Sequence, residues 1–348
     1  MIPGAARTRL LFCCTALSLL CALWARAQTG TDFDQGTTEF RAGNYAAAAA
    51  LFARAERAAS GKTSALLYEA KCLVHLQNFP GTEEALRSYL VFYPDSSDAL
   101  YLLGFVLNRQ NRPAESLNVY TKAAAIASPT GDDLKIVGLD YVLLDDYTDA
   151  IHWLEKAVER DATNVDAWYY LGRSCYTTGR RDQAWKAFAT VLNLDPHNVK
   201  AKNNLGLILE TDGQTETAID AYRTALLWQE HSLQPSEQPY VNLGNLLMEQ
   251  GQTKEALALL ETAATLAPNN AYCHLTLGMA YRELGRREPA QHELEKATQL
   301  EPSNARAHYQ LGRLYKETHD LDRAQAEFKK TADLDAQSAS PKAASTNH

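Results

Sequence analysis

The stretch from Val165 to Asn198 places its apolar residues with the period of two successive amphipathic helices. A first apolar stripe runs from Trp168 to Tyr176 and a second from Ala184 to Val191, and each puts its side chains on one helix face. Gly179 lies at the bend between the stripes, and Pro196 stops the second helix. The pattern predicts a unit of two short helices joined by a tight turn.

The same residue types recur at intervals of 34 residues on both sides of this stretch. Gly278 and Tyr281 repeat the pattern downstream, and Gly138 and Tyr141 repeat it upstream. A single slip of four residues falls within Trp228–Pro239, where we expect either a longer second helix or a longer loop. The spacing predicts nine units followed by a disordered tail at 339–348: 29–62, 63–96, 97–130, 131–164, 165–198, 199–236, 237–270, 271–304 and 305–338.

In spacing and residue type these units resemble the tetratricopeptide repeat, whose pattern runs W, L, G, Y, A, F, A, P over 34 residues. The resemblance covers residues 29–338 and leaves no room for another domain. It implies an all-α fold, a right-handed α-solenoid of about nine helix-turn-helix repeats, in which each repeat contacts only its neighbours. It also implies a protein or peptide partner rather than a catalytic activity.

The first 27 residues stand outside the repeats. Arg7 and Arg9 precede the uncharged run Leu10–Leu23, and Ala25–Ala27 is typical of a small-x-small cleavage site, so we interpret residues 1–27 as a secretory signal cleaved after the last alanine. An uncleaved anchor is the first alternative, although about 14 apolar residues fall short of the roughly 20 that span a bilayer. A lipoprotein modified at Cys21 is the second. We therefore expect an exported protein, periplasmic or secreted, with a bacterial envelope as the favoured compartment and no stable membrane insertion once the signal is removed.

Charge and composition narrow the class of partner. The chain has 34 basic and 42 acidic residues, for a formal net charge of −8. An acidic chain argues against nucleic acid, because phosphates demand a basic face. No histidine or cysteine set has the spacing of a metal site, and no nucleophile and base emerge that a repeat position does not explain, so we expect no cofactor, no metal and no enzyme activity.

Two local features invite other interpretations. Cys72, Cys175 and Cys273 remain after the signal and fall in separate repeats too far apart to bridge, so we expect three thiols without a disulfide. Ser60–Thr63 ends like a phosphate-binding loop, but Glu56 stands where such a loop requires its first glycine, and we interpret the segment as a turn.

The resemblance also indicates which side chains would meet a ligand, because positions 2, 5, 6, 9 and 12 to 13 of each repeat face the concave side of such arrays. These positions differ along the chain: Tyr101 and Phe105 make an apolar floor, Tyr169 and Arg173 a polar aromatic one, and repeats eight and nine contribute Tyr272, Met279, Arg282, Tyr309, Arg313 and Lys316. Tyrosine and arginine often carry interface energy, so this surface is the candidate binding site.

Asn204 and Asn242 occupy position 6 of adjacent repeats, where an amide can pair with the backbone of an extended peptide. A solvated helix residue is the plainer interpretation of either asparagine alone. We expect the pair to form a local clamp, and the predicted peptide-binding residues are Tyr169, Arg173, Lys200, Asn203, Asn204, Asn242 and Asn245.

The sequence therefore predicts an extracytoplasmic scaffold that binds an extended peptide or a helix of a partner protein in its concave groove. The alternative is an accessory subunit that delivers substrate to a separately encoded enzyme, and a stand-alone enzyme is the third possibility. A chaperone adaptor is disfavoured because the lysine and asparagine set that grips a C-terminal carboxylate in such proteins is incomplete, Lys135 being followed by Leu139.

Overall fold

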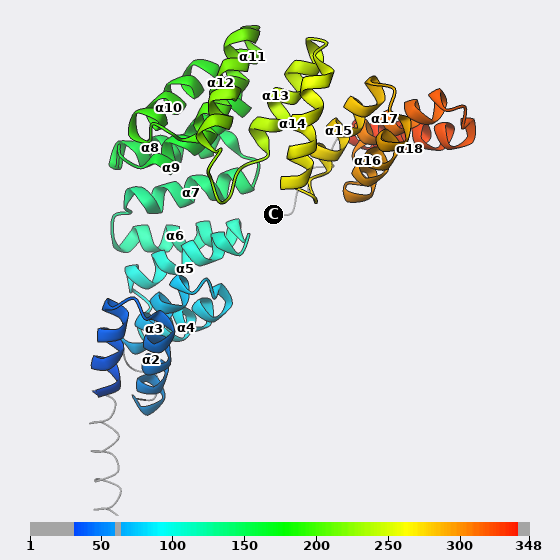
Figure 1. Cartoon of the computed structure of the whole chain (residues 1–348). Helices are drawn as coiled ribbons and strands as arrows, with labels where there is room; N and C mark the ends of the chain where they lie inside the picture. Colours follow the sequence, from blue (N-terminus) through cyan, green and yellow to red (C-terminus); the bar gives the residue numbers. More distant parts are fainter. Residues whose placement is uncertain (1–30, 60–63, 340–348) are drawn as a thin grey trace, which may run out of the picture. The chain divides into compact units, whose positions relative to one another are not determined.

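The computed structural model describes residues 31–59 and 64–339, and within them the protein is built from helices without any strand (Figure 1). This confirms the predicted all-α class. The chain divides into two compact units at Arg180. In both units each helix packs chiefly against the helices just before and after it in the chain, which is typical of a repeat array.

Unit 1 begins with helical residues 31–41 and continues with eight helices, each packed against the next one along the chain. They are α2 (Tyr45–Ala59), α3 (Ala65–His75), α4 (Phe79–Phe92), α5 (Ser97–Arg109), α6 (Pro113–Ile126), α7 (Gly131–Leu143), α8 (Tyr147–Arg160) and α9 (Val165–Thr177).

Unit 2 contains nine helices, from α10 to the long α18. They are α10 (Arg181–Leu194), α11 (Val199–Thr211), α12 (Thr215–Trp228), α13 (Gln238–Glu249), α14 (Thr253–Leu266), α15 (Ala271–Glu283), α16 (Arg287–Leu300), α17 (Ala305–Glu317) and α18 (Leu321–Ala339). We call α5, α7, α9, α11, α13, α15 and α17 first helices, since each opens one of the 34-residue units.

One backbone turn joins the two helices of each pair. Gly213 and Gly285 adopt φ of 73° and 74° there, in the left-handed region that favours glycine. The equivalent residues in other pairs are Asn111, Asp145 and His319, with φ of 59°, 58° and 64°. Asparagine and aspartate tolerate this conformation better than most residues, so the turn persists where the glycine is missing.

Glycine at the eighth position of a 34-residue repeat allows the two helices of that repeat to meet closely. A Cβ added at Gly206 would lie 2.5 Å from the ring of Tyr222, and one at Gly104 would lie 2.5 Å from the ring of Tyr120. Both tyrosines are buried, with 0% and 4% of their surface exposed. The second helix therefore inserts a tyrosine ring against bare backbone of the first.

The four-residue slip in the repeat pattern is a loop, and the alternative of a longer second helix is wrong. α12 ends at Trp228, and the loop is closed by the side chain of Gln229, which is 3% exposed. Its Nε2 donates to the carbonyl oxygen of Ser236 and its Oε1 accepts from the backbone N–H of Ser236, both at 2.9 Å. The amide thus imitates a backbone pair across the loop, while Leu233 at the tip is 99% exposed.

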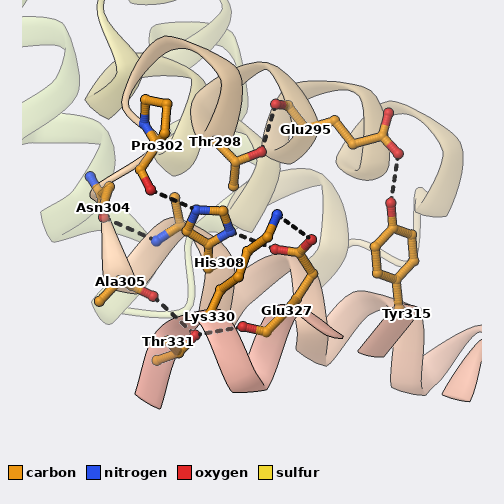
Figure 2. A network of polar contacts seen from close by, with 11 residues as sticks. Glu295, Thr298, Pro302, Asn304, Ala305, His308, Tyr315, Glu327, Lys330 and Thr331 are labelled. Carbon is orange, nitrogen blue, oxygen red and sulfur yellow. Dashed lines mark hydrogen bonds and ion pairs between the residues drawn. The ribbon is translucent and has the colours of Figure 1, made fainter. Parts of the chain in front are cut away.

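Buried histidines connect the two helices of a repeat in the last two 34-residue repeats. His308 of α17 donates from Nε2 to the carbonyl oxygen of Pro302 at 3.0 Å, and its Nδ1 lies 2.5 Å from Oε2 of Glu327 in α18 (Figure 2). His274 of α15 makes the same two contacts in the preceding unit, to Glu293 and to Pro268. We call this arrangement the histidine clasp.

Several predictions fall on residues with little or no structural description. The predicted signal at 1–27 lies outside the described residues, as does the predicted tail apart from Ala339, which ends α18. None of the helices within the described ranges is long and apolar enough to cross a membrane. Cys72, Cys175 and Cys273 are buried thiols without a disulfide, as expected, and burial raises the pKa of Cys72 and Cys175 to about 11.

Candidate partner-binding surfaces

The first-helix face of unit 1 carries a groove of about 600 Å³ between α5 and α7. Tyr101, Leu102 and Phe105 of α5 form one wall, and Ile136 of α7 lies opposite. These side chains are adjacent because positions 5, 6 and 9 of one helix lie on one face. The groove is therefore an apolar surface open to solvent, of the kind that buries apolar side chains of a ligand.

Contacts within unit 1 hold the tyrosines of the groove in place. The hydroxyl of Tyr101 donates to the carbonyl oxygen of Ala127 at 2.5 Å. Tyr120 packs with Tyr101, with ring centroids 5.8 Å apart, and lies against Gly104. Burial raises the pKa of Tyr120 and of Tyr101, so both remain neutral phenols at physiological pH. The wall of the groove is thus set before any ligand binds.

Charged residues line the rim of the same groove. Nζ of Lys135 donates to Asp132 at 2.8 Å, and Nδ2 of Asn164 donates to the same carboxylate at 2.8 Å. The hydrogen bond from Lys135 lowers the pKa of Asp132, although burial opposes this. Lys135 and Asp132 thus neutralise one another at the rim, and the apolar floor is the distinctive feature of the groove.

A buried carboxylate lies behind the groove, in the interior between α5, α6 and α7. Asp140 is fully buried, and its Oδ1 accepts from Nδ2 of Asn108 at 2.8 Å. Its Oδ2 has no hydrogen-bond partner among the described residues, because the hydroxyl of Ser116 donates to the carbonyl oxygen of Gly104 at 2.9 Å. Burial raises the pKa of Asp140 to about 6, although the hydrogen bond from Asn108 opposes the shift. The buried carboxylate of Asp140 was not predicted from the sequence. The available signal was Ser116, which stands at the repeat position that alanine occupies in most other repeats.

The first-helix face of unit 2 has a different character between α15 and α17. Tyr272 and Tyr309 are 41% and 45% exposed on this face. Nδ2 of Asn245, from α13, donates to the hydroxyl of Tyr272 at 2.8 Å and so links two first helices. Arg282 lies at the same face with its side chain 12% exposed, and Arg313 is exposed nearby. This surface is aromatic and cationic rather than apolar.

Of the seven predicted binding residues, two lie in unit 1 and five in unit 2. In unit 1, Tyr169 is half-buried with its ring edge-on to that of Tyr170, at 5.4 Å between centroids, and Arg173 is exposed. Each is one turn from the other on α9, as expected from positions 5 and 9.

In unit 2 the asparagines lie differently from the expected clamp. Asn203 and Asn204 are buried, at 1% and 8% exposed. Nδ2 of Asn242 donates to Oδ1 of Asn203 at 2.9 Å, and Nδ2 of Asn204 donates to the backbone oxygen of Lys200 at 2.7 Å. The amides therefore satisfy one another and their own helix, because adjacent first helices approach closely enough for Asn203 to meet Asn242. Lys200 is exposed, Asn242 and Asn245 are half-buried, and a ligand-binding role for the set stays a prediction.

The described residues contain no group of three or more histidine, cysteine, aspartate or glutamate side chains arranged to hold a metal ion. What both faces offer is contact surface: apolar and aromatic side chains in unit 1, and aromatic and guanidinium groups in unit 2. Such groups recognise another chain through burial and hydrogen bonding.

Comparison with known families agrees with this architecture. Two tetratricopeptide repeat models match the chain, one at residues 142–202, 247–299 and 290–346, and the other at 33–96, 82–132 and 176–235. Together they extend over most of the described sequence, and the chain belongs to the tetratricopeptide repeat family. Proteins of this family mediate protein–protein interactions, and their fold is typically non-catalytic.

Individual relatives are distant. The chain is 23% identical over 244 residues to anaphase-promoting complex subunit 3 of Schizosaccharomyces pombe, a match that covers 70% of this chain and 36% of that protein. This chain thus spans only about a third of the length of that relative. The chain is therefore similar to a segment of a larger protein, and the similarity concerns the repeat architecture alone.

Solved structures confirm the predicted solenoid fold. A chain of the anaphase-promoting complex hetero-tetramer Cut9–Hcn1 aligns with a TM-score of 0.59 at 18% identity, covering 80% of this chain and 54% of that one. A tetratricopeptide repeat protein from Parabacteroides merdae aligns with a TM-score of 0.58 at 16% identity, covering 77% of this chain and 97% of that one. At these identities the similarity establishes the fold alone.

Proposed function

We propose that the protein is an exported scaffold that binds an extended peptide or a helix of a partner protein along its first helices. The observation that carries the proposal is the apolar groove between α5 and α7, where Tyr101, Leu102 and Phe105 are only half-buried and line an opening to solvent. An open apolar groove on a repeat array favours a protein ligand that buries one or two apolar side chains.

Export is supported by the order of residues at the N-terminus. Two arginines, an uncharged apolar run and an alanine-rich triplet follow one another within 27 residues. Expression of the full chain in a bacterial host, followed by N-terminal sequencing of the protein from the periplasmic fraction, tests this part. A mature chain that starts at Gln28 supports export with cleavage, and a chain that stays in the cytoplasm with Leu10–Leu23 intact contradicts it.

Binding is tested by truncating the groove, with helicity followed in each variant because Phe105 also packs against the core clusters beside it. Phe105→Ala removes part of the apolar wall, so we expect a partner captured from envelope extract by the wild type to bind the variant at least about tenfold more weakly. Val91→Ala is the matched control, because Val91 is 75% exposed on the second helix α4, away from the groove lining. Affinities should be measured with the purified partner, and helicity should be equal in all three proteins.

Equal affinity of the wild type and Phe105→Ala would show that the groove is not the binding surface. A loss of affinity in Val91→Ala equal to that in Phe105→Ala would show that the effect is not specific to the groove. Either result contradicts the proposal.

A further inference from the structure

Two arginines from neighbouring repeats lie on the first-helix surface of unit 2, and the guanidinium of Arg282 reaches α17 at Gln310, one helical turn before Arg313. Arg282 belongs to α15 and Arg313 to α17. The side chain of Arg282 is only 12% exposed. Burial lowers the pKa of Arg282, and the positive charge of Arg313 lowers it further, while Glu317, Glu283 and Tyr309 oppose the shift. The fold therefore holds a half-desolvated guanidinium beside a second cation, an arrangement that is unfavourable on its own.

The hydrogen bonds available within the chain do not saturate this pair. Nη1 of Arg282 donates to Oε1 of Gln310 at 2.5 Å, whereas its Nε is 3.9 Å from the nearest oxygen of Glu317, beyond hydrogen-bonding distance. The guanidinium of Arg313 makes no hydrogen bond or ion pair with any other described residue. A guanidinium has five N–H donors, so most donors of the pair remain available.

Arg112 in unit 1 shows how the same chain satisfies an arginine that serves structure alone. Its guanidinium donates to Glu83 at 2.6 Å and to Glu115 at 2.7 Å through both Nε and Nη2. These contacts raise the pKa of Arg112, in the opposite direction from that of Arg282. By contrast, Arg282 has a single ion-pair contact, to Glu317 at 3.9 Å, and the guanidinium of Arg313 has none with a described residue, so the pair can take a further carboxylate.

The surroundings of the pair favour a peptide as the source of that anion. Tyr309 and Tyr272 expose about two fifths of their surface on the same face, and Asn245 holds the hydroxyl of Tyr272. Exposed aromatic rings beside arginine form contact surface for a polypeptide chain. The guanidinium fork also matches the two oxygens of a carboxylate.

We propose that Arg282 and Arg313 bind carboxylate groups of an acidic segment of the partner, with Tyr309 and Tyr272 contacting the chain that bears them. This rests on the proposed function and names the chemistry of one part of the ligand. A carboxylate placed between the two guanidinium groups would be attracted by both and would remove their mutual repulsion. Because the whole chain has a net charge of −8, an acidic peptide would be repelled elsewhere, so its binding is specific for a local cationic surface.

The test uses acetylated hexaglutamate as the probe and the full chain as the protein, titrated at low ionic strength. We expect saturable binding that weakens with added salt, and about tenfold weaker binding to Arg313→Gln and to Arg282→Gln. The matched control is Arg287→Gln, which removes an exposed arginine from the second helix α16. It should bind as the wild type does, and acetylated hexaglutamine should not bind.

Equal affinity of wild type and both variants for hexaglutamate would overturn the inference, and so would an absence of binding. Displacement of hexaglutamate by an equal concentration of inorganic pyrophosphate would also overturn it, because the pair would then be a phosphate site. The proposed function is judged separately: a partner that binds through the groove of unit 1 and binds Arg313→Gln as tightly as wild type leaves the scaffold intact and refutes only the acidic segment.

Discussion

In unit 1 the first-helix face between α5 and α7 is apolar, with Tyr101 and Phe105 at its centre, whereas in unit 2 the face between α15 and α17 presents Arg282, Arg313 and Tyr309. Both faces are built from helix pairs of the same kind, with the same turn conformation and the same close contact at a glycine. The comparison teaches that the framework residues fix the backbone, and that the remaining first-helix positions are free to carry different chemistry.

The interiors of the two units differ at equivalent positions as well. Between α6 and α7 of unit 1, Ser116 and Asp140 are buried polar residues. The equivalent residues of unit 2, Ala218 and Leu246, belong to one apolar cluster. Unit 1 therefore contains a buried ionisable group at a position where unit 2 has only hydrocarbon.

The largest expected effect comes from breaking the framework that the two units share. Gly206→Leu in unit 2 and Gly104→Leu in unit 1 each drive a side chain into a buried tyrosine ring, which a Cβ alone would approach to 2.5 Å. We expect each to lower the free energy of unfolding by about 3 kcal/mol, measured by denaturant titration.

A glycine outside the helix contact provides the control for these two variants. Gly213→Asn changes a residue with φ of 73° and no atom within 4 Å of its added Cβ, and asparagine tolerates that conformation. We expect a loss below about 1 kcal/mol. If the leucine variants unfold as the wild type does, the close helix contact is wrong.

An effect of similar size should separate the interiors of the two units. Folded Asp140 keeps its proton up to about pH 6, whereas the ordinary pKa of the group is 3.8. Between these values the folded state binds more protons than the unfolded state, so the contribution of Asp140 to stability is most favourable below about pH 4 and falls by about 3 kcal/mol as the pH rises past 6. Asp140→Asn removes the buried charge, and we expect it to be more stable than wild type at pH 8 by about that amount.

The pH dependence of the difference is the informative measurement. The stability advantage of Asp140→Asn over wild type should shrink as the pH falls from 7 to 4. Thermal unfolding of both proteins in matched buffers measures this difference. Asp220→Asn, an exposed position on α12, should show no such trend. A constant difference across the pH range would mean that Asp140 is ionised throughout, contrary to its burial.

The smallest effect sharpens the comparison of the two faces. Arg313→Gln removes one member of a like-charge pair without breaking a hydrogen bond, so we expect the melting temperature of the ligand-free protein to rise by about 1–2 °C, and by less in high salt. Lys135→Gln in unit 1 loses the 2.8 Å contact to Asp132 and should lower the melting temperature by a similar amount. Shifts of the same sign would show that the two charge arrangements are equivalent.

The fold was predictable because its determinants are local in sequence. Apolar stripes, the proline stops and Gly206 recur at fixed spacing, and each acts on its own helix pair. The turn at Asn111 was not marked by glycine, yet the flanking pattern sufficed. For these helices and turns, the repeat spacing of apolar residues is enough to predict the backbone structure.

Side-chain pairing between units was harder to predict. The sequence placed Asn204 and Asn242 as a pair, whereas the structure pairs Asn203 with Asn242, because a rotation of one helix by about one residue decides which amide meets its neighbour. The Arg282–Arg313 pair and the buried Asp140 likewise depend on which side chains from different helices converge. Repeat spacing does not encode that convergence.

The histidine clasp has a consequence for the last unit of the array. Within the described residues α18 packs against α17 and against no later helix, so we expect this end of the array to open most readily. His308 reaches both Pro302, before its own helix, and Glu327, in the final helix, so α18 cannot separate without breaking a contact that is 3% exposed to water at the histidine. Opening of the C-terminal end should therefore proceed by loss of α17 and α18 together, and amide exchange in these two helices should occur at one common rate.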